Sequence, residues 1–194
     1  MGEYPLGGQV RSTVGADMSF ATHAIHAACT AQATIATPLG NVLLARTARG
    51  LAGAWFEGQK DHPGELAAPE RPDDPVLRAA AAQLHAYFAG ATTSFELPLE
   101  LHGTSFQRGV WQALLQIGAG RTRSYSEIAQ QVGSPRAVRA VGAAIAKNPL
   151  SVIVPCHRVI GRSGALTGYA GGMQRKRALL ALEGVSTPAE SGVQ

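Results

Sequence analysis

Residues 124–158 read SYSEIAQQVGSPRAVRAVGAAIAKNPLSVIVPCHR, and their pattern indicates the fold of the second half of the chain. The spacing predicts a short helix over residues 124–132, a turn at Gly133-Ser134 and a second helix over residues 135–147. We expect the serine to cap the second helix and the proline after it to occupy the first helical position. Two helices joined by a tight, glycine-containing turn are typical of a helix-turn-helix unit.

The second of these helices combines small and basic side chains. Ala140 and Gly142 leave one face thin enough to lie close to a groove, and Arg136, Arg139 and Lys147 are candidates for phosphate or base contacts. This pattern alone is not specific, because many helical pairs without any role in DNA binding share it. The distribution of charge along the chain is therefore needed to judge whether this helical pair binds DNA.

Charge is divided unevenly along the 194 residues, which carry a net charge of +4. Residues 1–103 hold 6 Lys and Arg against 10 Asp and Glu, whereas residues 104–185 hold 11 against only Glu127 and Glu183. This division indicates two units, the second of which faces a polyanion. A basic surface that serves solubility alone is the alternative; we favour nucleic acid because the helix-turn-helix pattern accompanies the charge.

Composition excludes several classes of protein. With 45% apolar residues the chain is expected to be globular, it contains no apolar run long enough to cross a bilayer, and we expect no signal peptide. Its two cysteines, Cys29 and Cys156, make a poor disulfide framework, which favours a reducing, cytoplasmic setting.

The first half of the chain predicts a small sheet with one helix. Strands are expected over residues 33–37, 41–47 and 51–56, and a helix that begins at Asp74-Pro75 and ends at Gly90. Alternating apolar residues over 95–101, with Pro98 in the opposite phase, predict a half-buried edge strand. The expected organisation is a loosely ordered extension (1–32), an α/β domain (33–102), a mostly helical domain (103–185) and a flexible tail (186–194).

Two further helices are expected in the second domain. Phe106, Val110, Leu114 and Ile117 share one apolar face, and residues 174–182 form the last helix. The whole chain is therefore expected to be an α+β protein.

The run Ser151–Val154 predicts a buried strand that ends at Cys156, a residue suited to nucleophilic chemistry once its thiol loses a proton. His157 is a natural acceptor for that proton, but adjacent strand residues point to opposite faces, so a bridging water or a bend after Pro155 would be needed. Glu183 is the candidate to orient the histidine. The alternatives are an inert buried cysteine, a satisfied core histidine and a plain salt bridge at Glu183.

Several motifs together resemble one family, the O6-alkylguanine-DNA alkyltransferases, also called methylated-DNA–protein-cysteine methyltransferases, and more closely its bacterial members. The resemblance is dense from about residue 103 to 184 and looser over 33–102. The motifs that carry it are Gly103-Thr104-Ser105-Phe106-Gln107, Val110-Trp111, Ser124-Tyr125, Arg139-Ala140-Val141-Gly142, Asn148-Pro149, Pro155-Cys156-His157-Arg158-Val159, Gly168-Tyr169 and Gly171-Gly172.

The resemblance implies a direct-reversal repair reaction in which an alkyl group moves from guanine O6, or less well from thymine O4, to Cys156, once per molecule. His157 would deprotonate the thiol through water, and Glu183 would polarise the histidine. Asn148 would buttress the turn, and Tyr125 would protonate the leaving guanine. The implied fold is a ribonuclease H-like N-terminal domain followed by a winged-helix-like domain.

The same resemblance implies how DNA is held. Arg139 would enter the duplex from the minor groove and fill the gap left by the extruded nucleotide. Tyr169 and Ala170 would line the base pocket, and Val159 would contribute backbone contacts to the base. The implied set of DNA-contacting residues is completed by Arg136, Ala140, Gly142, Thr104 and Ser124.

The sequence departs from the family pattern at two positions and leaves rival functions open. Thr47 and Ala52 stand where some members bind zinc, so we expect neither metal nor cofactor, and we expect a monomer on double-stranded DNA, with cooperative binding left open. The rivals are a lesion-binding protein without an acceptor cysteine, a cysteine hydrolase that uses Cys156, His157 and Glu183, and a helix-turn-helix transcription factor.

Overall fold

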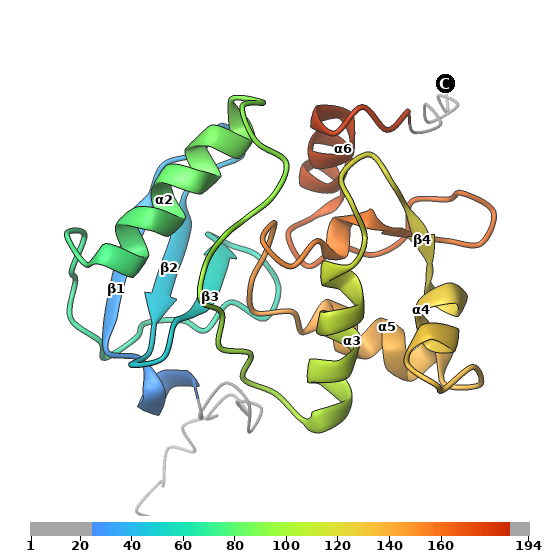
Figure 1. Cartoon of the computed structure of the whole chain (residues 1–194), viewed down its shortest axis with the longest axis horizontal. Coiled ribbons are helices and arrows are strands. Elements are labelled where there is room, and N and C mark those ends of the chain that lie inside the picture. The colour runs from blue at the N-terminus through green and yellow to red at the C-terminus, as the bar shows by residue number, and fades with distance from the viewer. Residues whose placement is uncertain (1–24, 187–194) are drawn as a thin grey trace, which may run out of the picture.

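The structure, a computed structural model, describes residues 25–186. Strands β1 (Ala31–Ile35), β2 (Val42–Arg46) and β3 (Leu51–Phe56) form an antiparallel sheet in the order β1-β2-β3. Helix α2 (Pro75–Phe88) packs against one face of this sheet (Figure 1).

Alternation of side chains explains how the sheet is buried. Leu44 on the central strand lies opposite Ala33 and Ala54 and faces the main core, whereas Ala45 belongs to a smaller cluster with Ile25, Trp55 and Leu66. Because both faces are covered, every residue of β3 is buried. The sheet is therefore covered on both faces and forms an inner layer of the fold.

The predicted first helix is confirmed. The Asp74 side chain accepts hydrogen bonds from the backbone N–H groups of Val76 and Leu77, and Pro75 occupies the first turn. The buried face of α2 consists of Leu77, Ala80, Leu84 and Tyr87. The hydroxyl of Tyr87 donates a hydrogen bond to Glu183, in the second half of the chain.

The edge strand predicted over residues 95–101 does not form, and the segment is an extended loop. The predicted alternation of half-buried and exposed side chains is present. This segment makes only an isolated bridge to β3, in which Leu51 N–H donates to Pro98 O (2.7 Å) and Glu100 N–H donates to Leu51 O (2.8 Å). A side chain at Gly50 would collide with the Pro98 carbonyl, so a glycine is needed for this close approach.

The second half consists of α3 (Ser105–Leu115), β4 (Arg123–Ser124), α4 (Tyr125–Gln131), α5 (Val138–Ala146), the short 3-10 helix η1 (Cys156–Arg158), β5 (Val159–Ile160) and α6 (Met173–Leu182). Strands β4 and β5 pair in parallel, and α5 packs against both α3 and α4. Phe106, expected on the apolar face of α3, is 36% exposed; the helix instead buries Val110, Trp111, Ala113 and Leu114.

Two local predictions around the helix-turn-helix are wrong. Helix α5 begins at Val138 and has no side-chain cap, because residues 134–137 form a turn closed by a hydrogen bond from Ala137 N–H to Ser134 O (2.8 Å). Residues 151–154 are buried but form a turn rather than a strand, with Val152 in the left-handed region (φ 71°). Burial had suggested a strand, but the turn buries its apolar side chains equally well.

The expected loosely ordered extension over residues 1–32 is only partly described. Residues 1–24 lie outside the described residues, as does most of the tail expected over 186–194. Residues 25–28 form a helical turn, Ile25 is buried, and β1 begins at Ala31, so the segment 25–32 is part of the fold.

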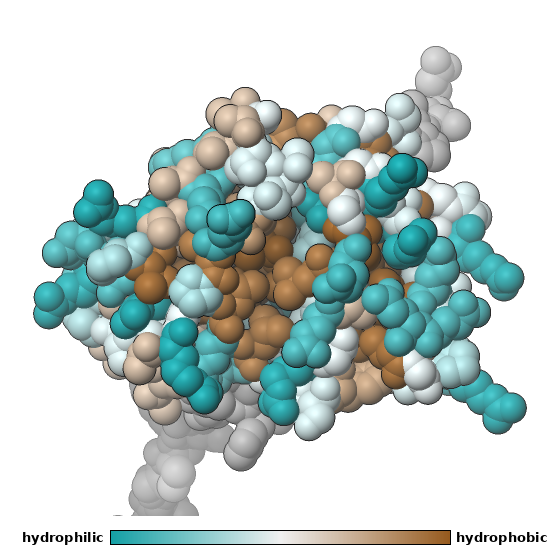
Figure 2. All heavy atoms as spheres, viewed as in Figure 1, coloured by the Kyte–Doolittle hydropathy of each residue, from teal (hydrophilic) through white to brown (hydrophobic). Residues whose placement is uncertain are grey.

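The two halves share one hydrophobic core. A single cluster of buried residues includes Leu44 and Leu84 from the first half and Val110, Ile128 and Leu179 from the second. Figure 2 shows apolar side chains gathered in the middle of one face, between α2 and α3. A groove of about 290 Å³ lies at this junction, and its apolar lining includes Phe95, Leu97, Leu99, Leu115 and Ile117.

Candidate active site around Cys156

Cys156 lies at the start of η1, directly after the buried turn. It is only 5% exposed, yet it lines a cavity of about 430 Å³. The lining residues come from the loop after β3, from α4 and α5, from η1 and from the loop before α6: Lys60, Tyr125, Gly142, Ile145, Ala146, Cys156, Thr167, Gly168, Tyr169 and Ala170. The sulfur is therefore buried against a hollow that could take a small aromatic group.

Asn148 holds the turn that carries the cysteine. Its Nδ2 atom lies within hydrogen-bond distance of Val154 O (2.8 Å), Leu150 O (3.3 Å) and Cys156 Sγ (3.1 Å), and its Oδ1 accepts from Leu150 N–H (3.0 Å). One buried amide thus closes the turn and points N–H toward the sulfur.

His157 contacts Glu183 through one of its two ring nitrogens. Its Nε2 atom lies 2.9 Å from Glu183 Oε1, and its buried Nδ1 atom has no hydrogen-bond partner among the described residues. We expected Cys156 and His157 to lie at the end of a strand and to point to opposite faces. They lie instead in a 3-10 helix. The expected pairing of His157 with Glu183 is confirmed.

Glu183 collects three further hydrogen bonds. Arg158 donates from Nε to Oε2 (2.9 Å) and from NH2 to Oε1 (2.8 Å), and Tyr87 donates its hydroxyl proton to Oε1 (2.6 Å). Burial alone would raise the pKa of Glu183, but the hydrogen bonds from His157, Arg158 and Tyr87 outweigh it and hold that pKa well below its usual range. The carboxylate is therefore both a salt-bridge partner and the residue that orients the histidine.

Burial dominates the titration of the cysteine and the histidine. It raises the pKa of the Cys156 thiol, while the Asn148 hydrogen bond and the charge of Lys176 oppose that rise. It lowers the pKa of His157 against the opposing effect of Glu183. At neutral pH the site thus holds a protonated thiol beside a neutral imidazole that can accept a proton.

Two tyrosines, Tyr125 and Tyr169, form part of the cavity wall. Tyr125, the first residue of α4, donates its hydroxyl proton to Thr167 O (3.3 Å). The Tyr169 ring packs so closely on Gly171 that any side chain there would overlap it. The Ala170 carbonyl accepts from Lys60 N–H (2.9 Å), which ties this wall to the first half of the chain.

The predicted backbone contact between Val159 and the base remains a prediction. Val159 is fully buried and does not line the cavity; its N–H donates to Cys156 O, and its carbonyl accepts from Lys176 Nζ (2.6 Å). Its carbonyl oxygen has a second lone pair beyond this hydrogen bond.

The residues predicted to contact DNA fall into two groups. Arg136, Arg139 and Ala140 are exposed on the turn before α5 and on its first turn, and Gly142 lines the cavity from the same helix. Thr104 and Ser124 are helix caps, since each accepts a hydrogen bond from the backbone N–H three residues later, and their contact with DNA remains a prediction.

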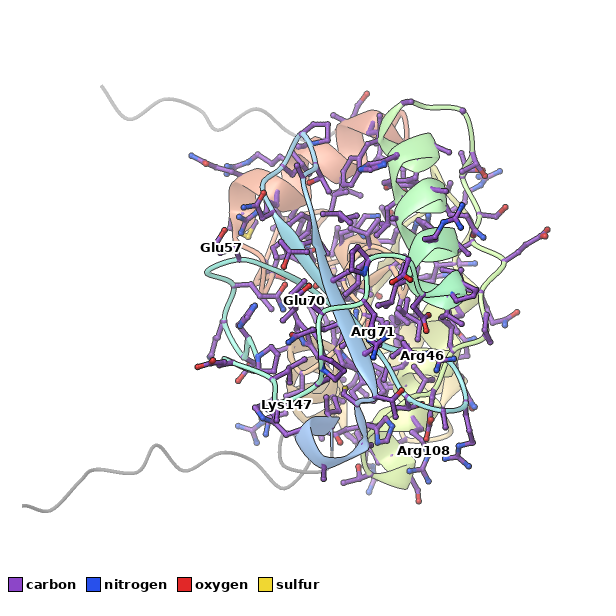
Figure 3. All side chains as sticks on the ribbon, turned by 90° about the vertical axis from the view of Figure 1, so that its left-hand side faces the viewer. Arg46, Glu57, Glu70, Arg71, Arg108 and Lys147 are labelled. Carbon is purple, nitrogen blue, oxygen red and sulfur yellow. The ribbon has the colours of Figure 1, made fainter. Side chains whose placement is uncertain are left out.

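Charges on the sheet side of the molecule are mixed in sign. Figure 3 shows Glu57 and Glu70 on the same face as Arg46 and Arg71, with Lys147 and Arg108 toward its lower edge. Arg46 lies 3.6 Å from Asp74 in an ion pair. This face therefore offers no patch of one sign to a polyanion.

Within residues 25–186, no group of three His, Cys, Asp or Glu side chains could hold a metal ion, and no helix has the length and apolar character needed to cross a membrane. Thr47, at one of the positions compared with zinc ligands, is buried and donates a hydrogen bond to Glu100.

Two family models match the chain. Residues 31–101 match the ribonuclease-like domain of 6-O-methylguanine DNA methyltransferase, and residues 105–185 match the DNA-binding domain of the same family. The chain belongs to the methylated-DNA–protein-cysteine methyltransferases.

Individual relatives of this methyltransferase are similar over most of their length. A Mycobacterium tuberculosis protein is 50% identical over 157 residues, which is 81% of this chain and 94% of the relative. A Bacillus subtilis protein is 46% identical and covers 76% of this chain and 90% of the relative. The crystal structure of the M. tuberculosis protein in complex with DNA matches with a TM-score of 0.72, covering 79% of this chain and 92% of that one.

Sequence reasoning missed three residues around Cys156 of this methyltransferase. Arg158 was part of a quoted motif but received no role, and Tyr87 was hidden in a helix of the other half. Lys176 had a detectable signal, because it shares a helical face with the buried Leu179 and Leu180, three and four residues further on.

Proposed function

We propose that this methyltransferase repairs alkylated DNA by transferring the alkyl group from guanine O6 to Sγ of its own Cys156, once per molecule. The observation that carries this proposal is the placement of a nearly buried sulfur on the wall of a cavity of about 430 Å³, with the His157–Glu183 pair beside it. An inert core cysteine would have no reason to line such a cavity.

The reaction follows from the groups around the sulfur. His157 Nδ1 would take the thiol proton through a bridging water, since no hydrogen bond joins the ring to Sγ among the described residues. The thiolate then attacks the alkyl carbon, the S–C bond forms and the C–O6 bond breaks with its electron pair going to guanine. Tyr125 donates a proton to guanine, and the proton first taken from sulfur replaces it, so the products are a thioether and neutral guanine.

The target base must leave the stack to reach this cavity. We propose that α4 and α5 dock in the minor groove and that Arg139 fills the space of the extruded nucleotide, which offsets the cost of unstacking. Exposure of Arg136, Arg139 and Ala140 on one side, and of Gly142 toward the cavity, supports this arrangement.

We further propose that residues 33–102 act as a scaffold and that residues 103–185 form the DNA-binding domain. The protein would act as a monomer on double-stranded DNA. O4-alkylthymine would be a poorer substrate. A reduced thiol is required, which places the reaction in the cytoplasm.

Intact-protein mass spectrometry after incubation with a duplex containing O6-methylguanine tests the function. We expect the protein to gain one methyl group on Cys156 and then to stop, and C156S to gain none while still binding the duplex. A protein that remains unmodified but retains affinity for the lesion would support a lesion-binding protein instead. Turnover of a small ester or amide without methylation would support a cysteine hydrolase.

A further inference from the structure

Tyr87 brings a hydroxyl group from the first half of the chain to Glu183 in the second half. It lies on the buried face of α2 with Leu77, Ala80 and Leu84, which are all apolar, and it is only 1% exposed. A phenylalanine ring would fill the same space. Because a buried hydroxyl is costly unless it is hydrogen-bonded, the contact that this hydroxyl makes indicates its role.

The hydroxyl meets an oxygen that has two other donors. The Tyr87 hydroxyl lies 2.6 Å from Glu183 Oε1. The same oxygen lies 2.9 Å from His157 Nε2 and 2.8 Å from Arg158 NH2. A carboxylate oxygen has two lone pairs, so these three donors compete for fewer acceptor sites than they could fill. Each donor therefore weakens the hold of Oε1 on the other two.

The protonation states at this oxygen follow from its surroundings. Burial would raise the pKa of Glu183, but its hydrogen bonds outweigh burial and lower it, so the carboxylate only accepts. Burial raises the pKa of the Tyr87 hydroxyl, which therefore remains a donor. His157 must then donate from Nε2. Its Nδ1, which has no hydrogen-bond partner among the described residues, is left as the atom that takes a proton.

We propose that Tyr87 is a positioning residue: by sharing Oε1 of Glu183, its hydroxyl limits the pull of the carboxylate on His157 and keeps the imidazole neutral until Cys156 gives up its proton. This inference deepens the proposed function and rests on it for the role of His157 as the base. A carboxylate with fewer donors is more basic and holds an imidazolium more tightly. The first half of the chain thus supplies a group to the site and does not act only as a scaffold.

The other groups around His157 come from η1, α6 and α3. Burial lowers the pKa of His157 and Glu183 opposes that fall, whereas the charges of Arg158 and Lys176 add to it. Arg158 is fixed by its two hydrogen bonds to the carboxylate, and Lys176 donates to two backbone carbonyl groups. Helix α3 also packs against η1, but its one charged residue, Arg108, is exposed. A variant that lacks only the tyrosine hydroxyl leaves all of these groups in place.

The test follows the titration of His157 by NMR between about pH 4 and pH 9, without DNA, with H157Q to identify its signal among the six histidines. Y87F keeps the ring and removes the hydroxyl, and we expect it to raise the pKa of His157 by about 0.5 to 1 pH unit, the effect of one hydrogen bond. Placing 3-fluorotyrosine at position 87 gives a more acidic hydroxyl that donates more strongly, so we expect it to lower the same pKa.

The two replacements of Tyr87 separate this role from a structural one. Loss of packing would shift the pKa of His157 in the same direction in both proteins, or not at all, and either result would overturn the proposal. L84V, on the same buried face of α2, should reduce stability and leave the pKa unchanged. If Y87F does not fold, the 3-fluorotyrosine protein, which keeps both the ring and the hydroxyl, still decides.

The pH profile of single-turnover methyl transfer from a duplex with O6-methylguanine is a second readout, which serves if the protein unfolds before His157 takes a proton. Its acid limb should move to higher pH in Y87F and to lower pH with 3-fluorotyrosine. A rate reduced by the same factor at every pH would contradict the proposal. A protein that transfers no methyl group at any pH would count against the proposed function, whereas the NMR titration tests Tyr87 without DNA.

Discussion

His157 and Glu183 are 26 residues apart in sequence, yet Nε2 of the histidine lies 2.9 Å from Oε1 of the glutamate. The same carboxylate accepts two hydrogen bonds from Arg158 and one from Tyr87, which belongs to the first half of the chain. Glu183 cannot turn away from His157 without also leaving a buried guanidinium unpaired. The orientation of the imidazole is therefore coupled to the packing of the whole molecule.

Replacing Glu183 by glutamine should reduce both stability and alkyl transfer. The change leaves Arg158 buried without a counter-charge, and breaking one partner of a buried ion pair costs about 3–5 kcal/mol. Chemical denaturation measures the stability, and single-turnover methyl transfer measures the rate. E65Q, at an exposed position, is the matched control. Transfer at the unchanged rate in folded E183Q would show that the carboxylate does not assist His157.

Acid should destabilise this protein in two steps. Burial lowers the pKa of His157 in the folded state, so the unfolded chain binds a proton first as the pH falls through about 6.5. The pKa of Glu183 is also lowered, and the stability it contributes is present above about pH 4.3 and lost below it. Urea midpoints between pH 8 and pH 3 check both steps. H157Q should flatten the upper step, whereas H85Q, an exposed control, should not. Burial also lowers the pKa of His62, so H62Q should flatten the upper step in part.

Asn148 should not tolerate aspartate despite the equal size. N148D replaces the donors that face Val154 O, Leu150 O and Cys156 Sγ by a carboxylate, which repels those oxygens and disfavours the thiolate. We expect a loss of about 1–3 kcal/mol or more in stability and slower alkylation of the thiol. N148A should also lose stability, because the hydrogen bonds that close the turn are gone, but it adds no negative charge. If both variants shifted the pH profile of alkylation equally, the amide would act only through structure.

Arg139 should matter for duplex DNA and not for the free base. R139A removes an exposed cation from the first turn of α5, and we expect transfer from O6-methylguanine in a duplex to slow by roughly tenfold, about 1.4 kcal/mol, while reaction with the free base is unchanged. R78A on α2 serves as the control. Equal losses with both substrates would contradict a role in filling the space of the extruded nucleotide.

Short-range patterns were sufficient for most of the fold. The Asp74-Pro75 start of α2 follows from its cap, and the three strands of the sheet and the helical pair α4–α5 follow from side-chain period and turn residues, although α5 lacks the cap expected at Ser134. The same reasoning failed where two local structures bury the same side chains. Residues 151–154 are as apolar as a core strand, but the positive φ of Val152 and the amide of Asn148 make them a turn.

The proposed nucleophile and its histidine were visible in the sequence because a rare cysteine, a histidine and a proline stand side by side near a basic helical pair. Their surroundings were not visible, since the partners of Glu183 and the buried position of Lys176 depend on residues brought together from α2, η1 and α6. Local pattern thus predicts which elements form and which side chain reacts, because caps, turns and periodicity act over a few residues. Charge balance and cavity shape arise only when distant segments exclude water together, and that depends on tertiary packing.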